Sequence, residues 1–228
     1  MPRFLERSSI VHRISLLLLA ATLAIFAAFT GFVAVGSGRA LLNDAGRQLD
    51  RKVALLGEML AFYDQTLRHD TRQLGNIFFS MFPKGMRLDA ARTVAIGDID
   101  SPVLEYEGRP LNLDFEAVDH FTKMTGGAAT VFVRDGDDFL RITTSLKKGD
   151  GTRAIGTYLG TTHPGYRRLL DGEEYFGHAN LFGRAYMTRY IPVLDDSGRT
   201  IAILFIGFDY SAGMTSLRET IRSLEIGA

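Results

Sequence analysis

The sequence predicts an α+β fold in which an antiparallel sheet flanked by helices follows a long N-terminal helix, and this helix continues from one transmembrane helix. Three observations support this prediction. Residues 14–38 carry no charge, residues 39–82 repeat apolar side chains at helical spacing, and residues 86–210 alternate short apolar runs with glycine and aspartate turns. The first pattern is typical of a membrane helix, the second of a helix packed along its length, and the third of short strands.

The composition excludes several classes of protein. The 228 residues include 26 lysines and arginines and 26 aspartates and glutamates, so the formal net charge is zero, with no basic excess to attract nucleic acid. There is no cysteine, which excludes a disulfide scaffold, a thiolate zinc site and cysteine catalysis. The length allows one domain with an anchor or two very small domains.

The uncharged stretch, residues 14–38, is longer than the ~20 residues that a helix needs to cross a bilayer. Three arginines and one glutamate precede it, so the positive-inside rule places residues 1–13 in the cytoplasm and the residues after Arg39 outside. A cleaved secretory signal is the alternative. Because the apolar region of a signal is only about 7–15 residues long, an uncleaved anchor is favoured.

A long helix is predicted over residues 39–82, ending at the turn that contains Pro83 and Gly85. Two series of apolar side chains recur every seven residues: Leu42, Leu49, Leu56 and Tyr63, and Val53, Leu60, Leu67 and Leu74. This stripe either docks on the chain's own domain or pairs with a second subunit, and different turns can do each. We expect a homodimer formed through this helix.

The compact domain, residues 86–210, is predicted to be an antiparallel sheet with helices on one face, of the PAS type. Asp114 is the expected N-cap of its first helix and Gly126 the expected stop. The expected elements are strands at 92–96 and 102–106, a helix at 114–124, a hairpin of 128–134 and 139–145, a short helix at 163–170, an irregular strand at 175–181, and a hairpin of 186–194 and 200–208. Residues 211–228 are amphipathic and predict a C-terminal helix.

Catalytic and metal-binding signatures are missing from the sequence. It contains none of the G-x-S-x-G, H-E-x-x-H, P-loop or G-x-G-x-x-G motifs. The five histidines stand at no metal-ligand spacing, and the aspartates at 135–138 lack the ligand pattern of a calcium loop. We therefore expect no enzyme activity, no cofactor and no metal.

Two arginines in the middle of predicted strands are the best candidates for binding. Alternation places Phe139, Arg141 and Thr143 on one face of a strand, and it separates Tyr186 from Arg189 on the two faces of another. A guanidinium binds a carboxylate through two parallel hydrogen bonds, and hydroxyl groups would orient that ligand. The alternative is that both arginines face solvent or pair with acidic residues across the sheet.

Three segments carry a resemblance to a known family. Residues 130–147 (TVFVRDGDDFLRITTSLK), 181–190 (LFGRAYMTRY) and 198–209 closely resemble the Cache-type sensor domain called the Cache 3/Cache 2 fusion, and the likeness covers about residues 74–228. The resemblance implies a PAS-like fold that binds small molecules, often carboxylates, without cofactors. It implies a periplasmic input domain of a methyl-accepting chemotaxis receptor or a related signalling protein. Its pocket candidates here are Arg141, Thr143, Tyr186 and Arg189.

The expected function is therefore extracytoplasmic sensing of a small organic ligand such as a carboxylate, on a single-pass protein of the bacterial inner membrane. The alternative is a membrane-anchored protein-interaction module without a small-molecule ligand. An exposed apolar patch, with Arg141 and Arg189 both facing solvent, would favour that alternative. Residues 223–227 resemble the lead-in to a second Cache module, so we expect a truncated form of a signal-transduction protein.

Overall fold

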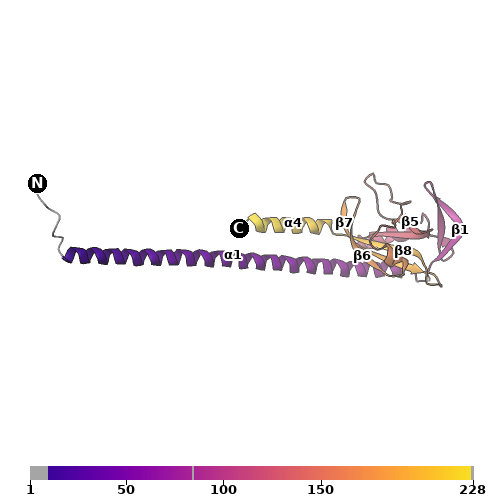
Figure 1. Cartoon of the computed structure of the whole chain (residues 1–228). Helices are drawn as coiled ribbons and strands as arrows, with labels where there is room; N and C mark the ends of the chain where they lie inside the picture. Colours follow the sequence, from indigo (N-terminus) through magenta and orange to yellow (C-terminus); the bar gives the residue numbers. More distant parts are fainter. Residues whose placement is uncertain (1–9, 84, 227–228) are drawn as a thin grey trace. The chain divides into compact units, whose positions relative to one another are not determined.

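The computed structural model describes residues 10–83 and 85–226, and the chain divides into two compact units, Met1–Ala61 and Phe62–Ala228. The predicted cytoplasmic segment, residues 1–13, lies largely outside the described residues. The first described element is helix α1 (Ile10–Ser80), one continuous helix of 71 residues (Figure 1). The predicted membrane helix and the predicted long helix are thus parts of a single element.

Within the first unit, α1 is long and apolar enough to cross a membrane. The segment Ile14–Val33 has 20 residues with a mean hydropathy of 2.4, and none of it is buried in the protein. Its two threonine hydroxyls are satisfied inside the helix, since Oγ1 of Thr22 donates to the carbonyl of Leu18 at 3.0 Å and Oγ1 of Thr30 to that of Phe26 at 2.8 Å. A polar side chain bonded in this way costs little in a lipid environment.

The apolar stripe of α1 changes its role along the helix. In the second unit Leu67 is buried at 3 % exposure, and Leu74 packs against the core of the sheet domain. In the first unit Leu49 and Val53 are 62 % and 61 % exposed. The helix ends at Ser80, two residues before the predicted end, and a turn follows it.

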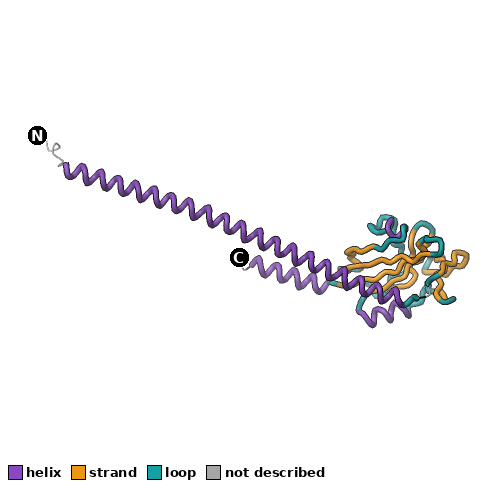
Figure 2. The backbone as a smooth tube through the Cα atoms, turned by 90° about the horizontal axis from the view of Figure 1, so that it is seen from below, coloured by secondary structure: helices purple, strands orange, loops and turns teal. Residues whose placement is uncertain are grey.

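The second unit is built around a five-stranded antiparallel sheet in the order β5-β4-β8-β7-β6. Figures 1 and 2 show these strands gathered beside the end of α1 that carries Ser80. The strands are β4 (Ala128–Asp135), β5 (Asp138–Thr144), β6 (Tyr175–Leu181), β7 (Arg184–Leu194) and β8 (Thr200–Asp209). Both predicted hairpins are confirmed, and the predicted irregular strand is the regular edge strand β6, which pairs with β7 over its whole length.

A smaller sheet and three helices complete the second unit. The sheet contains β1 (Arg87–Ile96), β2 (Ile99–Tyr106) and β3 (Arg109–Pro110), and the helices are α2 (Glu116–Thr125), α3 (Tyr166–Leu170) and α4 (Ser211–Ile226). The prediction that Asp114 is the N-cap is wrong by one residue, since the N-cap of α2 is Phe115, which makes no side-chain capping bond. Asp114 accepts a hydrogen bond from the amide of Glu116 at 3.0 Å, and Gly126 stops α2 as predicted, with a φ of +72°. The predicted strands at 92–96 and 102–106 are the C-terminal parts of β1 and β2.

The five-stranded sheet has two covered faces, which we call the helix face and the loop face. The helix face packs Val131, Leu204 and Ile206 against side chains of α1 and α2 such as Phe78 and Phe121. The loop face packs Phe132 and Phe205 under the connection between β5 and β6, residues 145–174, which includes α3. The sheet is therefore flanked by helices on both faces, whereas the sequence predicted helices on one.

Candidate ligand-binding site

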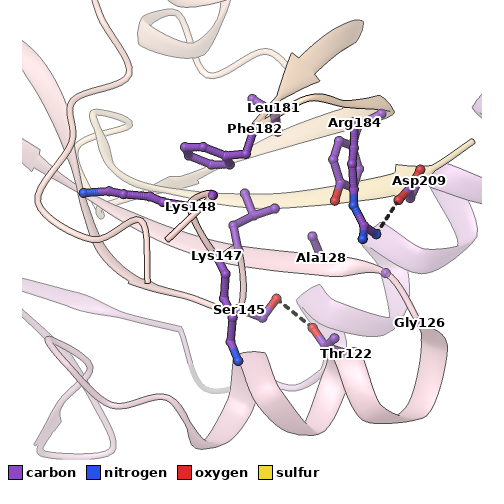
Figure 3. Close-up of a pocket in the computed structure, with 14 residues that line it drawn as sticks. Thr122, Gly126, Ala128, Ser145, Lys147, Lys148, Leu181, Phe182, Arg184 and Asp209 are labelled. Carbon is purple, nitrogen blue, oxygen red and sulfur yellow. Dashed lines mark hydrogen bonds and ion pairs between the residues drawn. The ribbon is translucent and has the colours of Figure 1, made fainter. Parts of the chain in front are cut away.

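A cavity of about 420 Å³ opens at one end of the loop face. It lies where the end of β5 and the turn between β6 and β7 approach the start of β4 (Figure 3). Its lining consists of Thr122, Gly126, Gly127, Ala128, Ser145, Leu146, Lys147, Lys148, Gly149, Leu181, Phe182, Arg184, Tyr186 and Asp209. This volume is within the range of about 300–1,000 Å³ that small-molecule sites occupy.

The charged side chains of this cavity are mostly cationic. Lys147 and Lys148 follow β5, Arg184 is the first residue of β7, and Asp209 is the last residue of β8. In Figure 3 the side chains of Lys147 and Lys148 extend in different directions, away from the other lining residues, and the Arg184 guanidinium points to Asp209. Three cations thus surround a cavity whose lining has one carboxylate, and that carboxylate already has a partner.

Arg184 and Asp209 form an ion pair on the wall of the cavity. Nη1 of Arg184 lies 3.1 Å from Oδ2 of Asp209, and the two side chains are 69 % and 26 % exposed. Burial raises the pKa of Asp209, but hydrogen bonds from Ser211 and Arg184 outweigh that effect, so the pKa lies below its ordinary value. Asp209 is therefore a carboxylate at neutral pH.

The turn between β6 and β7 brings Arg184 to the cavity. Phe182 and Gly183 both have positive φ angles, 53° and 83°. Positive φ at both central residues is the conformation of the two-residue turns that join tight hairpins. The strained conformation falls on Phe182, whose ring lines the cavity and is 45 % exposed. With Leu181, Leu146 and Ala128, this ring gives the cavity an apolar part next to its cations.

Tyr186 is the one of the four predicted site residues that lines the cavity. It stands on β7 opposite Asp209 of β8 and is 8 % exposed. Burial is the main reason that its pKa is raised; the charge of Asp209 adds to this effect and that of Arg184 opposes it. Its hydroxyl group is therefore protonated at neutral pH.

Arg141 stands on the same face as Tyr186, but residues 153–159 cover it. Its Nη1 donates to the carbonyl of Ala154 at 3.1 Å, and its guanidinium lies 5.0 Å from the centre of the Phe132 ring. Its buried Nε has no hydrogen-bond partner among the described residues. Burial lowers the pKa of Arg141 to about 10, and the nearby Tyr190 opposes this shift. A cation held in this way is costly, because little compensates for its lost hydration.

Thr143 lies on the helix face, and the prediction that it shares a face with Arg141 is wrong. The register of the hairpin shifts between Val131, which pairs with Thr143, and Phe132, which pairs with Arg141. This β-bulge adds one residue and reverses the alternation of the side chains beyond it. Oγ1 of Thr143 donates to the carbonyl of Asp114 at 2.6 Å, which attaches β5 to the start of α2.

Arg189 also lies on the helix face, where it attaches the sheet to α1. Its Nη1 donates to the carbonyl of Arg72 at 2.7 Å and to Oδ1 of Asn76 at 2.8 Å. Its Nε and Nη2 bind the two carboxylate oxygens of Glu174 at 3.0 and 2.7 Å. At 5 % exposure, with four hydrogen bonds to protein atoms, Arg189 is positioned as a structural residue. The structure thus brings Arg141 and Tyr186 to one face, and Thr143 and Arg189 to the other.

Sequence reasoning missed Lys147, Lys148 and Arg184. All three lie at the ends of strands, where cationic side chains are ordinarily solvated. The available signal was the pair Phe182-Gly183 between two apolar runs, because a two-residue turn points the side chains that flank it to a common edge.

A second cavity, of about 510 Å³, lies between the end of α1, β2, β3 and α2. Its lining mixes apolar side chains such as Phe82 and Tyr106 with both acidic and basic ones such as Glu116 and Arg109.

Within residues 10–83 and 85–226, no group of three histidine, aspartate or glutamate side chains is placed to hold a metal ion.

One comparison with known proteins identifies a family for this chain. The family model described as the Cache 3/Cache 2 fusion domain matches residues 38–228. No curated protein matches the sequence. Two of the matching solved structures are a protein described as a transcriptional regulator of Rhodococcus sp. RHA1 and the C-terminal domain of the E. coli transcriptional regulator KdgR. The first is 12% identical to this chain, and the match covers 42% of this chain and 56% of the regulator, with a TM-score of 0.29. The second is 15% identical, and the match covers 40% of this chain and 76% of the KdgR domain, with a TM-score of 0.24.

Proposed function

The chain belongs to the Cache 3/Cache 2 fusion domain family, and from this premise we propose that it senses a small organic anion as the input module of a bacterial chemoreceptor or related signalling protein. Cache domains are extracellular sensor modules rather than catalysts. The apolar segment Ile14–Val33 fits a single-pass membrane protein whose Cache domain is extracytoplasmic. The chemoreceptor, its chemotaxis output and the bacterial inner membrane are parts of the proposal.

The observation that carries the proposal is the charge of the cavity on the loop face. Lys147, Lys148 and Arg184 line it, and its one carboxylate, Asp209, is paired with Arg184. An anion that enters meets a net positive field, and the Phe182 ring offers it an apolar contact. A small carboxylate with a short apolar part matches both features. Tyr186 would donate its hydroxyl hydrogen to such a ligand.

The burial of both candidate arginines weakens the alternative, a protein-interaction module. Arg141 and Arg189 both facing solvent would favour that alternative, but Arg189 is 5 % exposed and the guanidinium of Arg141 donates to the carbonyl of Ala154. Arg189 and Thr143 have structural partners in the protein. The proposal therefore places the ligand against Tyr186 and the three cations, with Arg141 deeper on the same face.

We extend the proposal to a homodimer formed by the first unit of α1. Leu49, Val53 and Leu60 are 62 %, 61 % and 46 % exposed and follow the spacing of a coiled-coil stripe. A second copy would cover this stripe. Sedimentation of the full chain in detergent should give a dimer, and Leu49→Asp with Val53→Asp should give a monomer. A wild-type chain that stays monomeric at high concentration contradicts this extension.

A thermal-shift screen of the full chain in detergent tests the sensing proposal. The panel contains small carboxylates such as acetate, succinate and citrate, with uncharged and cationic metabolites for comparison. A ligand that binds only the native state stabilises it by ~2.7 kcal/mol at a hundredfold excess over its Kd. We expect at least one carboxylate, and no cationic metabolite, to raise the unfolding temperature. A folded protein that no carboxylate stabilises contradicts the proposal.

A further inference from the structure

The junction between β8 and α4 is held by hydrogen bonds to the first residues of β7. Asp209 ends β8, and its Oδ1 accepts a hydrogen bond from the amide of Ser211, the first residue of α4, at 2.9 Å. The amide of Ala185 donates to Oγ of Ser211 at 2.9 Å, and the amide of Tyr210 donates to the carbonyl of Ala185 at 3.0 Å. The first turn of α4 is therefore attached to the start of strand β7, whose first residue is Arg184.

Asp209 has a second role at this junction. Its Oδ2 binds Nη1 of Arg184 at 3.1 Å, while its Oδ1 satisfies the first amide of α4. Both side chains line the cavity on the loop face (Figure 3). Arg184 thus holds Asp209 in the rotamer that caps α4, and it does so from the wall of the cavity.

We propose that the Arg184–Asp209 ion pair couples ligand binding in the cavity to the stability of the first turn of α4. This inference rests on the proposed function. A carboxylate ligand binds the Arg184 guanidinium in place of Asp209, and the charge of the ligand repels the released Asp209 carboxylate. Asp209 then leaves its capping rotamer and the first turn of α4 loosens. The exchange of one carboxylate for another costs little, because the interaction it replaces is a surface ion pair.

The loosening stays local because other contacts keep α4 on the second unit. The hydroxyl of Tyr210 lies 2.8 Å from Nδ1 of His178, whose Nε2 lies 2.7 Å from Oδ1 of Asp64 on α1. Gly213 packs so closely against Tyr63 that an added Cβ would lie 2.4 Å from its hydroxyl oxygen. These contacts do not involve the cavity, so ligand binding changes the first turn of α4 without detaching the helix.

Coupling between two sites is reciprocal. If a ligand competes with Asp209 for Arg184, removing the charge of Asp209 must favour the ligand. Asp209→Asn removes this charge but keeps a side-chain oxygen that caps a helix well. The variant therefore separates the capping role of the residue from its competition with the ligand.

The first arm of the test needs no ligand. Amide hydrogen exchange is measured on the full chain in detergent for the wild type and Arg184→Gln. We expect the amides of residues 211–214 to exchange about two- to fivefold faster in Arg184→Gln, the range that a surface ion pair supports. The control is Arg199→Gln, since Arg199 pairs with Asp195 in another turn, with side-chain exposures of 61 % and 26 % that match those of the Arg184–Asp209 pair. Unchanged exchange at residues 211–214 in Arg184→Gln overturns the coupling.

The second arm uses succinate as the probe, with its binding measured separately by calorimetry. We expect succinate to speed exchange at residues 211–214 in the wild type but not in Arg184→Gln, and to bind Asp209→Asn about two- to fivefold more tightly than the wild type. Succinate that binds without these effects overturns the coupling and leaves the sensing proposal standing. If neither succinate nor another carboxylate of the panel binds, the sensing proposal fails, and the first arm still decides whether Arg184 holds the start of α4.

Discussion

Gly75 and Arg189 are in direct contact where α1 packs on the sheet: a Cβ atom added to Gly75 would lie 2.6 Å from Nη1 of Arg189. The absence of a side chain at Gly75 lets the guanidinium reach the carbonyl of Arg72 at 2.7 Å. An arginine from the middle of a strand is thus bound directly to the backbone of α1.

The first prediction concerns Gly75→Ala. Glycine to alanine normally stabilises a helix by up to ~1 kcal/mol, but here the methyl group displaces a guanidinium that Glu174 and Asn76 hold in place. Overpacking of this kind costs about 1–3 kcal/mol, so we expect a net loss of stability in urea unfolding followed by circular dichroism. Gly57→Ala is the control, since nothing lies within 4 Å of its added Cβ. Equal stabilities for the two variants would show that Arg189 moves aside freely.

The second prediction is that Arg189 stabilises the fold without contributing to ligand affinity. Arg189→Ala removes hydrogen bonds to a carboxylate, an amide oxygen and a main-chain carbonyl, at a cost of about 2–3 kcal/mol. Arg168→Ala serves as the control, because the Arg168–Glu173 pair is exposed and should change stability by less than about 0.5 kcal/mol. Urea unfolding gives the stabilities, and calorimetry gives the carboxylate affinity, which we expect to be unchanged. A large loss of affinity in a folded Arg189→Ala variant would assign it to the ligand.

The third prediction is that Arg141→Met folds as stably as the wild type. The buried Nε of Arg141 has no hydrogen-bond partner in the part of the chain that the structure describes, and the carbonyl of Ala154 keeps a second donor, Oγ1 of Thr157 at 3.3 Å. Replacing a poorly compensated buried charge with an apolar side chain of similar size is often neutral or stabilising. Arg141→Ala, which leaves an unfilled space, should be less stable by about 2–4 kcal/mol.

Carboxylate binding to Arg141→Met then locates the ligand. The cavity is not lined by Arg141, so we expect affinity within about threefold of the wild type. A loss of tenfold or more in this stable variant would place the ligand deeper, under residues 153–159.

The fourth prediction concerns pH. Burial lowers the pKa of His163, whose ring packs on Tyr190 and Tyr175 with centroid distances of 4.8 and 5.3 Å. Between its folded pKa and the unfolded value of about 6.5 the unfolded chain binds more protons, so stability is lost as pH falls through this window. His163→Asn removes the titration and keeps an acceptor for the amide of Gly165. The free energy of unfolding should fall less steeply between about pH 7 and 5 in this variant than in the wild type. Parallel curves would contradict the assignment.

Much of the fold was predictable because local patterns specify it. An uncharged stretch longer than a bilayer, a seven-residue repeat and two hairpins joined by aspartate and glycine are signals within single elements. Each of these elements forms where it was predicted, although α1 begins four residues before the predicted start and ends two residues before the predicted end. The predicted strand at 92–96 is less exact, since β1 begins five residues earlier. The continuity of α1 was predicted from the absence of a helix-breaking proline between the uncharged stretch and the seven-residue repeat, and it is confirmed.

The site was less predictable because it depends on relations between elements. Alternation separated Tyr186 and Arg189 correctly, but the bulge opposite Val131 moved Thr143 to the other face, and nothing in the sequence marks it. Lys147 and Arg184 meet at one cavity only because the ends of two hairpins are adjacent in the sheet domain. Strand order, not sequence spacing, determines this proximity.

A calorimetric titration of the full chain in detergent decides whether this cavity binds anions, with succinate as the ligand or the panel carboxylate that stabilises the protein most. The comparison is between the wild type, a variant with Lys147→Gln and Lys148→Gln, and the control Lys123→Gln, which removes one positive charge from α2 outside the cavity lining. We predict that the wild type binds, that the double variant binds about three- to tenfold more weakly, and that Lys123→Gln binds like the wild type. Saturable binding that none of these substitutions alters, or no binding by a folded wild type, would contradict the assignment of this cavity as an anion-sensing site.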